Sequence, residues 1–469
     1  MLAGIDRGTI VVLPSLSFPP EELRKITAIL HYETRLLCTA LWLGNPDLEL
    51  IYITSIPIEP TIVDYYLSFL PDPAGARDRL HLFALDDRNL GSLSQKLLGR
   101  REVLDGIKER IRHPAYLLPF NVTGAEAQIA EVLELPLYGP RPELTHLGSK
   151  SGARRLARQA GVATLDGAEE LRSPEDLERE IEALRRRRPG IAGVVVKLNE
   201  GFSGQGNVIV NLDGMSGAVT GSDALFCGTG ESWETYLPKM LADGAIVEEL
   251  VTHPQAVSPS AQMRIDENGI CTLVSTHDQR LGGPARQVYL GCSFPAHPEY
   301  RGAVADQALK IGSALAHEGV TGFFGIDFMV VPDSGGLQVF LSEINLRIGG
   351  TTHPFLTAAS VTGGALDAKT GELMAGGAIK HYVATDNLKS PSFVGLRPHD
   401  VIEALRASDL AFDPRSGTGV TLHLLGALEE HGKCGAVSIA DSIDEADALQ
   451  SELSYMIEKV GRGVRGSAT

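Results

Sequence analysis

The chain has 469 residues, which at roughly 150 residues per domain predicts about three domains. Hydrophobic residues make up 43% and charged residues 22% of the chain, and this composition excludes a disordered or fibrous protein. The 42 basic and 59 acidic residues give a net charge of −17, so nucleic acid is not an expected partner, because binding phosphates requires a basic surface.

The N-terminal segment, residues 1–144, alternates β-rich runs with helical patterns. Predicted strands lie at 9–13, 48–56, 80–85, 115–120 and 135–138, and predicted helices lie between them at 20–30, 61–70, 93–111 and 125–133. Strands separated by helices predict a parallel sheet with right-handed crossovers, which is a Rossmann-like α/β domain. No GxGxxG motif follows the first strand, which continues into Pro14 and Ser15, so a dinucleotide site is disfavoured and a packing, substrate-facing domain is predicted.

The central segment, residues 145–362, begins with a basic helix that contains Lys150, and the apolar strand at 193–197 ends in Lys197. The stretch that follows is rich in glycine and serine, with Gly201, Ser203, Gly204 and Gly206. Backbone N–H groups in such a loop can turn toward one point and approach a polyphosphate. A purely structural hairpin explains the same glycines equally well, and the order of residues is not that of a Walker A loop.

A pair of strands further along the central segment carries carboxylates in an apolar context. Asp327 lies in the first strand, and Glu343, Asn345 and Arg347 alternate with apolar residues in the second, so these three side chains share one face. If the strands pair through a hairpin at 332–336, Asp327 reaches the same space. Two carboxylates and an amide oxygen suit Mg²⁺, which prefers oxygen ligands.

The order of these features resembles the ATP-grasp superfamily of carboxylate–amine ligases, over about residues 150–352. The N-terminal stretches 52–55, 63–67 and 119–123, together with 196–201, are similar to a smaller group of these ligases with a pre-ATP-grasp domain, which includes the peptide ligase of pheganomycin biosynthesis. The resemblance implies a fold of mixed α/β and α+β type. It consists of a Rossmann-like domain at 1–144, an ATP-grasp catalytic region at 145–362 and a small C-terminal α/β cap at 363–469.

The resemblance also implies roles for individual residues, with ATP and Mg²⁺ as cofactors. Lys150 and Lys197 would hold phosphates, and Lys197 would also act in catalysis. The loop residues Ser203, Gly204 and Gly206 would cover the phosphates, and the hinge formed by Glu248, Glu249, Leu250 and Val251 would bind adenine, with Glu248 at the amino group. Asp327, Glu343 and Asn345 would carry the metal ions, and Arg347 would steady the substrate carboxylate or the transferring phosphate.

Some positions leave alternatives open. Gly325 stands where some related ligases have an arginine that contacts the transferring phosphate, and Arg264 and Arg280 are two candidates to replace it, each equally well explained as a surface ion pair. Of the two, Arg280 is predicted to be the catalytic residue. His277 could line the substrate pocket or a structural loop, and His353 is a weak candidate for acid–base chemistry.

The C-terminal segment has a predicted helix at 398–407, strands at 420–425 and 436–439, and a helix at 443–460. It resembles the C-terminal region of the same ligases and is interpreted either as a cap beside the active site or as a dimerisation surface. The sequence does not fix the oligomeric state, although a homodimer is common for this type of enzyme.

The cysteines and the N-terminus bear on the compartment. Five cysteines are scattered without a CxxC pair, which argues against disulfides or structural zinc and favours a reducing compartment. Apolar runs are shorter than the 18 or so residues of a membrane span, and the first residues lack the features of a signal peptide. We therefore expect a cytoplasmic protein without membrane contact.

The predicted function is ATP-dependent ligation of a carboxylate to an amine through an acyl phosphate, in natural-product biosynthesis. The acid would be an amino acid or derivative, and the amine an amino acid or peptide. Ligation of a small non-peptide amine and a non-catalytic ATP-binding scaffold are the alternatives.

Overall fold

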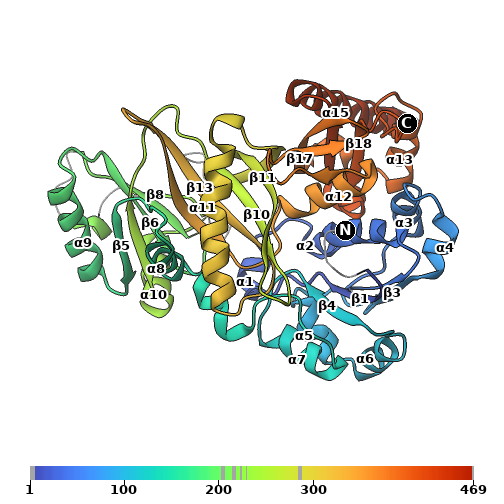
Figure 1. Cartoon of the computed structure of the whole chain (residues 1–469), viewed down its shortest axis with the longest axis horizontal. Coiled ribbons are helices and arrows are strands. Elements are labelled where there is room, and N and C mark those ends of the chain that lie inside the picture. Colours follow the sequence, from blue (N-terminus) through green and yellow to red (C-terminus); the bar gives the residue numbers. More distant parts are fainter. Residues whose placement is uncertain are drawn as a thin grey trace.

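The computed structural model describes residues 6–201, 206–213, 218–221, 224–228, 230–283 and 288–466. Figure 1 shows an elongated molecule in which the lobe containing β5, β6 and α9 lies at one end. The N-terminal sheet and the C-terminal helices lie together at the other end, with the long helix α11 between the two. The five cysteines are free, and no described helix is long and apolar enough to cross a membrane.

The N-terminal sheet is parallel, as the sequence predicted, with strand order β3-β2-β1-β4. Its strands are β1 (Gly8–Leu13), β2 (Leu48–Thr54), β3 (Leu80–Ala84) and β4 (Ala115–Pro119). The helical elements around it are α1 (Pro20–Leu23), α2 (Ile29–Tyr32), the 3₁₀ helix η1 (Glu33–Gly44), α3 (Pro60–Leu67), α4 (Pro73–Asp78), α5 (Leu93–Leu98), α6 (Arg101–Lys108), α7 (Gly124–Leu133) and η2 (Pro142–Gly148). Strands β2 and β3 lie on one side of β1, and β4 lies on the other side. The carboxyl ends of β1 and β4 therefore form a topological switch point.

Two predicted helices are interrupted and one predicted strand is wrong. The helix predicted at 20–30 ends at Leu23, and the left-handed Ala28, with φ 64°, separates it from α2. The helix predicted at 93–111 divides into α5 and α6 around Gly99. The strand predicted at 135–138 makes only an isolated bridge between Leu137 and Leu117. Pro136 has no N–H with which to extend a ladder of hydrogen bonds.

The second sheet has five strands in the order β5-β9-β6-β7-β8. These are β5 (Gly167–Leu171), β6 (Gly193–Leu198), β7 (Asn207–Asn211), β8 (Ala224–Phe226) and β9 (Ala245–Glu249). The associated helices are α8 (Lys150–Ala160), α9 (Pro174–Arg187), η3 (Val219–Gly221) and α10 (Trp233–Asp243). All the pairings in this sheet are antiparallel, so β6 and β9 bring the predicted lysine strand beside the predicted hinge.

The third sheet has ten strands and joins the central and C-terminal segments. Its path is β14-β13-β10-β11-β12-β17-β16-β15, with β19 paired to β17 and β18 paired to β19. The strands are β10 (Pro259–Ile265), β11 (Cys271–Gly282), β12 (Val288–Phe294), β13 (Gly322–Asp333), β14 (Gly336–Asn345), β15 (Ala365–Leu366), β16 (Leu373–Ala375), β17 (Ala378–Lys389), β18 (Gly419–His423) and β19 (Lys433–Ala440). Its helices are α11 (Pro298–His317), α12 (Thr352–Thr362), η5 (Pro391–Phe393), α13 (Pro398–Arg406), η6 (Leu425–Ala427), α14 (Leu428–His431) and α15 (Ile443–Gly466). The segment after residue 362 therefore continues the sheet of the predicted catalytic strands.

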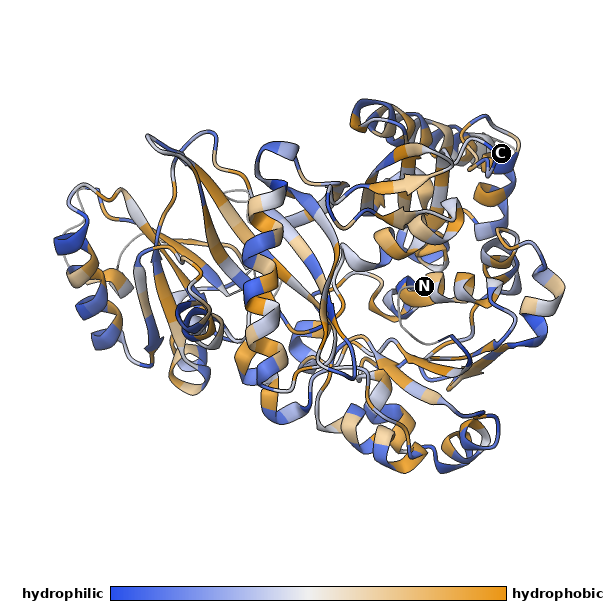
Figure 2. Ribbon diagram, viewed as in Figure 1, coloured by the Kyte–Doolittle hydropathy of each residue, from blue (hydrophilic) through white to orange (hydrophobic). Residues whose placement is uncertain are grey.

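Hydrophobic packing joins the N-terminal sheet to the C-terminal segment. One core cluster contains Tyr52 from the first sheet, Phe355 from α12 and Tyr382 from β17. Figure 2 shows hydrophobic residues concentrated along the strands, whereas helices at the periphery such as α9 carry many hydrophilic residues. Burial of these large side chains is the dominant favourable term in folding, and it holds the N-terminal and C-terminal ends of the chain together.

Candidate functional site

The predicted metal ligands meet on the hairpin of β13 and β14. Asp327 lies directly opposite Glu343 in the antiparallel register, and the turn closes between Asp333 and Gly336, as the sequence predicted. Asn345 donates its amide N–H to Asp327 Oδ2 at 3.0 Å. The two carboxylates and the amide offer only oxygen as metal donor, so this donor set fits Mg²⁺.

The two carboxylates have different electrostatic surroundings. Burial and the neighbouring Glu343 raise the pKa of Asp327 above its ordinary value. Burial also opposes ionisation of Glu343, but Lys150, with smaller contributions from Arg347 and Lys197, outweighs burial and lowers the pKa of Glu343. The ionised form is therefore favoured at Glu343 and disfavoured at Asp327.

Lys150 connects this hairpin to the helix α8. Ser149 caps the helix by accepting a hydrogen bond from the Gly152 N–H, which fixes Lys150 in the first turn. The Lys150 side chain is 5% exposed, and its Nζ lies 2.7 Å from Glu343 Oε1 and 3.3 Å from the carbonyl oxygen of Gly201. A predicted phosphate-binding lysine is thus in contact with a predicted metal ligand.

Lys197 and Glu248 form a second buried pair between β6 and β9. Lys197 Nζ lies 2.6 Å from Glu248 Oε2, and Arg154 Nη1 lies 2.9 Å from Glu248 Oε1. Glu248 is 1% exposed, so its charge is neutralised by these two cations in the protein interior. The carboxylate predicted at the adenine amino group therefore faces basic side chains.

The rest of the predicted hinge offers backbone groups. The Glu249 carboxylate accepts a hydrogen bond from Arg188 at 2.7 Å, and the Leu250 N–H donates to the Gly193 carbonyl at 2.9 Å. Among the described residues, the Val251 N–H has no hydrogen-bond partner. An unpaired amide directly after a strand is the kind of donor that a heterocyclic nitrogen can accept from.

The glycine-rich loop is described only in part. Ser203 and Gly204 lie outside the described residues, but Gly206 is described, with φ 80°. Its carbonyl oxygen accepts hydrogen bonds from the Leu198 N–H and the Tyr236 hydroxyl, both at 3.0 Å. The positive φ explains the glycine at this position, because other residues rarely adopt that conformation.

Arg347 lies at the end of β14 beside the two carboxylates. Its side chain is partly buried and, within the described part of the chain, makes no hydrogen bond or ion pair. Burial lowers the pKa of Arg347, the charges of Glu343 and Asp327 oppose this, and the charge of Arg35 adds to it. The guanidinium is consequently available to an anionic ligand.

The two alternative arginines lie elsewhere. Arg280, on β11, forms an ion pair with Asp447 of α15, with Nη2 2.8 Å from Oδ2. Its neighbour Gln279 instead donates to Asp327 Oδ1 at 2.7 Å, because adjacent residues of a strand point to opposite faces. Burial raises the pKa of Tyr138, and the charge of Arg264, on β10, opposes this rise. Gln279 was not predicted from the sequence, which carries no local signal that β11 lies near β13.

The histidines considered in the sequence are buried. His277 is hydrogen-bonded to the Tyr382 hydroxyl at 2.6 Å, and burial lowers the pKa of His277 to about 3. His353 Nε2 lies 3.3 Å from Asp386 Oδ1, and His423 Nε2 lies 2.7 Å from the same oxygen. The Asp386 carboxylate therefore organises a polar cluster between α12, β17 and β18.

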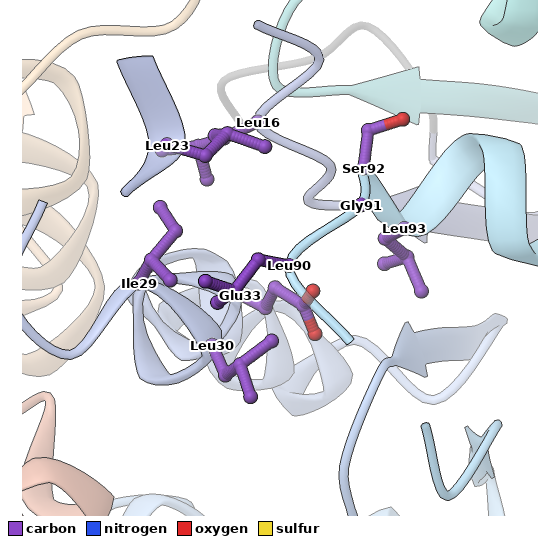
Figure 3. A pocket seen from close by; sticks show the side chains of 9 residues that line it. All are labelled: Leu16, Leu23, Ile29, Leu30, Glu33, Leu90, Gly91, Ser92 and Leu93. Carbon is purple, nitrogen blue, oxygen red and sulfur yellow. The ribbon is translucent and has the colours of Figure 1, made fainter. Parts of the chain in front are cut away.

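A recess lies near the carboxyl end of the N-terminal sheet. Figure 3 shows Glu33 among apolar side chains; the lining consists of Leu16, Leu23, Ile29, Leu30, Glu33, Leu90, Gly91, Ser92 and Leu93. Glu33 accepts hydrogen bonds from the Ser55 N–H at 2.5 Å and the Ser55 hydroxyl at 2.7 Å. Burial raises the pKa of Glu33 to about 7, although both Ser55 contacts lower it.

Comparison with known proteins finds two family models and a full-length relative. The model "IQCH-like, ATP-grasp" matches residues 227–369, and "PGM1 C-terminal domain" matches residues 400–453. The chain is 29% identical over 457 residues to the L-propargylglycine–L-glutamate ligase of Streptantibioticus cattleyicolor, which covers 94% of this chain and 92% of that protein.

Solved structures share the fold across nearly the whole chain. An N5-carboxyaminoimidazole ribonucleotide synthetase in complex with ADP matches with a TM-score of 0.55 and 12% identity, covering 97% of each chain. The biotin carboxylase domain dimer of the Hydrogenobacter thermophilus 2-oxoglutarate carboxylase, in complex with MgADP, ADP and bicarbonate, matches with a TM-score of 0.54 and 13% identity, covering 94% of this chain and 88% of that one. The predicted combination of an α/β N-terminal domain with an ATP-grasp fold is confirmed.

Proposed function

We propose that this ATP-grasp ligase, which uses ATP and Mg²⁺ to join a carboxylate to an amine, links an amino acid or derivative to a second amino acid or short peptide. The observation that carries the proposal is the convergence of Asp327, Glu343, Lys150 and Arg347 at one end of the β13–β14 hairpin. Similarity over 94% of the chain to a ligase named for two amino acids supports amino acids as substrates, and it supports a role in natural-product biosynthesis.

The reaction has two steps in which charge must be neutralised. A substrate carboxylate oxygen attacks the γ-phosphorus of ATP, the bond from that phosphorus to the bridging oxygen breaks, and ADP leaves. The amine nitrogen then attacks the carbonyl carbon of the acyl phosphate, loses a proton, and expels phosphate to leave an amide. Both the attacking carboxylate and the ATP phosphates are negative, so cations are required to bring them together.

The side chains divide this work. Lys150 and Lys197 bind phosphate oxygens, exchanging their present contacts with Glu343 and Glu248 for contacts with the nucleotide. Asp327, Glu343 and Asn345 hold Mg²⁺, which when bound neutralises the reacting oxygens. Arg347 steadies the reacting carboxylate or the transferring phosphate. Arg280 is less suited to that role, because it pairs with Asp447 while its neighbour Gln279 points to Asp327.

Nucleotide recognition relies on the hinge and the glycine-rich loop. Glu248 to Val251 bind adenine, with the unpaired Val251 N–H as the donor best suited to a ring nitrogen. Ser203, Gly204 and Gly206 cover the phosphates and exclude water, which would otherwise hydrolyse the acyl phosphate.

We also propose a compartment and an oligomeric state for this enzyme. We assign the enzyme to the cytoplasm because its five cysteines are free, and we assign it a homodimeric state by analogy with the dimeric biotin carboxylase domain. Light scattering coupled to gel filtration tests the assembly, and a monomer at micromolar concentration would remove it from the proposal.

The experiment that tests the function is mass spectrometry of the purified protein with Mg-ATP, a pool of amino acids that includes L-glutamate and L-propargylglycine, and a pool of short peptides. We expect a new mass equal to acid plus amine minus water, together with ADP, that is absent with Glu343→Gln. ADP formation without an amide would indicate a different acceptor, and ATP binding without turnover in any pool would favour the scaffold alternative.

A further inference from the structure

Another arginine, Arg35 on η1, is buried near Arg347. Its side chain is 8% exposed and contacts two aromatic rings, with the guanidinium carbon 4.6 Å from the Tyr32 ring centroid and 4.9 Å from that of Phe120. Phe120 directly follows β4, at the switch point of the N-terminal sheet. This is where ligands bind in open α/β sheets, beyond the carboxyl ends of the strands.

The Phe120 contact leads directly to the catalytic strand. The Phe120 carbonyl oxygen accepts a hydrogen bond from the Ile348 N–H at 2.9 Å, and Ile348 is the residue after Arg347. The charge of Arg35 also contributes to the lowered pKa of Arg347. Two guanidinium groups, one from the N-terminal domain and one from the end of β14, are therefore brought close to one another at this junction.

One nitrogen of the Arg35 guanidinium has a hydrogen-bond partner and another has none among the described residues. Its Nη1 donates to Asp386 Oδ2 at 3.2 Å, while the other oxygen of that carboxylate, Oδ1, accepts from His423 at 2.7 Å. Its Nε is buried without a hydrogen-bond partner among the described residues. Because stacking and the Asp386 contact fix the plane of the guanidinium, the edge that contains Nε is oriented before any ligand arrives.

A guanidinium that is held in a fixed plane and has an unpartnered Nε can receive a carboxylate. Arginine binds carboxylates through two parallel N–H groups, and the Nε edge offers such a pair. A buried donor without a partner is costly, so the geometry favours a ligand that supplies an anionic oxygen there.

We propose that Arg35 binds the non-reacting carboxylate of an amino-acid substrate, and that Asp386 positions the Arg35 guanidinium for this contact. The inference rests on the proposed function, because it supplies that ligase with its means of recognising amino acids. The reacting carboxylate is at the metal ligands and Arg347, while the second carboxylate lies at the junction of Phe120 and η1. Selectivity for free amino acids over their amides is the consequence.

The test compares each substrate of the wild-type enzyme with its analogue in which the non-reacting carboxylate is a primary amide. For one of the two substrates, we expect the kcat/KM of the wild-type enzyme to be at least about 100-fold higher with the carboxylate than with its amide analogue. A preference of this size is typical of a buried site whose polar groups are left unpaired by the wrong substrate. Arg35→Gln should reduce that preference to less than about tenfold, and Arg35→Lys, which keeps the charge and loses the two-pronged geometry, should fall between them.

The preference is a ratio within one variant, so it does not depend on how much of that variant is folded. Arg88→Gln is the matched control, since Arg88 has a 73% exposed side chain and contacts only Glu430, at 4.0 Å, among the described residues. If wild type forms no amide with any pair of substrates, the proposed function fails and this inference with it. If wild type is active and Arg35→Gln keeps the full preference for the carboxylate, the inference alone is refuted.

Discussion

Replacing Glu343 by glutamine should suppress turnover while the protein stays folded. Glu343 lies opposite Asp327 in the register and 2.7 Å from Lys150 Nζ, so the change removes a negative charge at the centre of the site without changing its shape. At an effective dielectric constant of about 20, a unit charge about 4 Å from a second unit charge is worth about 4 kcal/mol. Since each 1.4 kcal/mol or so corresponds to a factor of ten, the expected loss of turnover is about 1,000-fold.

The same change should have a smaller effect on stability. Removing one partner of a buried ion pair lowers the free energy of unfolding by about 3–5 kcal/mol when the other charge is left without a partner. In Glu343→Gln the Lys150 charge still interacts with Asp327, so the loss of stability should be smaller. The assay is ADP release as a function of Mg²⁺ concentration, with a thermal melt of each protein. Glu403→Gln, at a pair with exposed side chains, is the control. Turnover within tenfold of wild type at saturating Mg²⁺ would refute the assignment of Glu343 as a metal ligand.

Three further predictions concern the loop, the recess and the C-terminal helix. Tyr236→Phe removes the hydrogen bond to the Gly206 carbonyl and should raise the KM for ATP by about two- to tenfold, measured by ADP release; an unchanged KM would show that this contact does not order the loop. The pKa of Glu33 is raised to about 7 from an ordinary 4.5, so the folded state holds more protons than the unfolded state between these values and the free energy of unfolding falls as pH rises through that window. The free energy of unfolding, measured in urea at about pH 5 and about pH 8, should decrease between these pH values by about 3 kcal/mol less in Glu33→Gln than in wild type. Equal pH dependence in both proteins would contradict this prediction. Arg280→Ala and Asp447→Ala should each lower stability by less than about 1 kcal/mol, because the pair is partly exposed. A loss of turnover above about 100-fold in the arginine variant alone would instead support Arg280 as the catalytic cation.

Local pattern was sufficient for β1 to β4 of the N-terminal sheet and for the hairpin of β13 and β14. Alternation places Glu343 and Asn345 on one face, and the turn before Gly336 is short enough to bring Asp327 opposite Glu343 without help from the rest of the chain. The parallel N-terminal sheet follows in the same way from strands separated by helices. The hairpin and the individual strands and helices depend on residues within a few tens of positions of one another, and the sequence therefore determined them.

Contacts between distant segments were decided only by the tertiary structure. Gln279 meets Asp327 because β10 lies between β11 and β13, and Arg35 meets Asp386 across the junction of η1 and β17. The 3₁₀ helix η1 was itself unpredicted, since its residues are buried on almost all sides and show no single apolar face. Charge partners follow the same rule: the sequence shows that Lys197 and Glu248 are present, but only the pairing of β6 with β9 neutralises one by the other. Periodicity and turn chemistry are local properties of the chain, whereas the identity of a neighbour in space depends on which surfaces bury the most apolar area together.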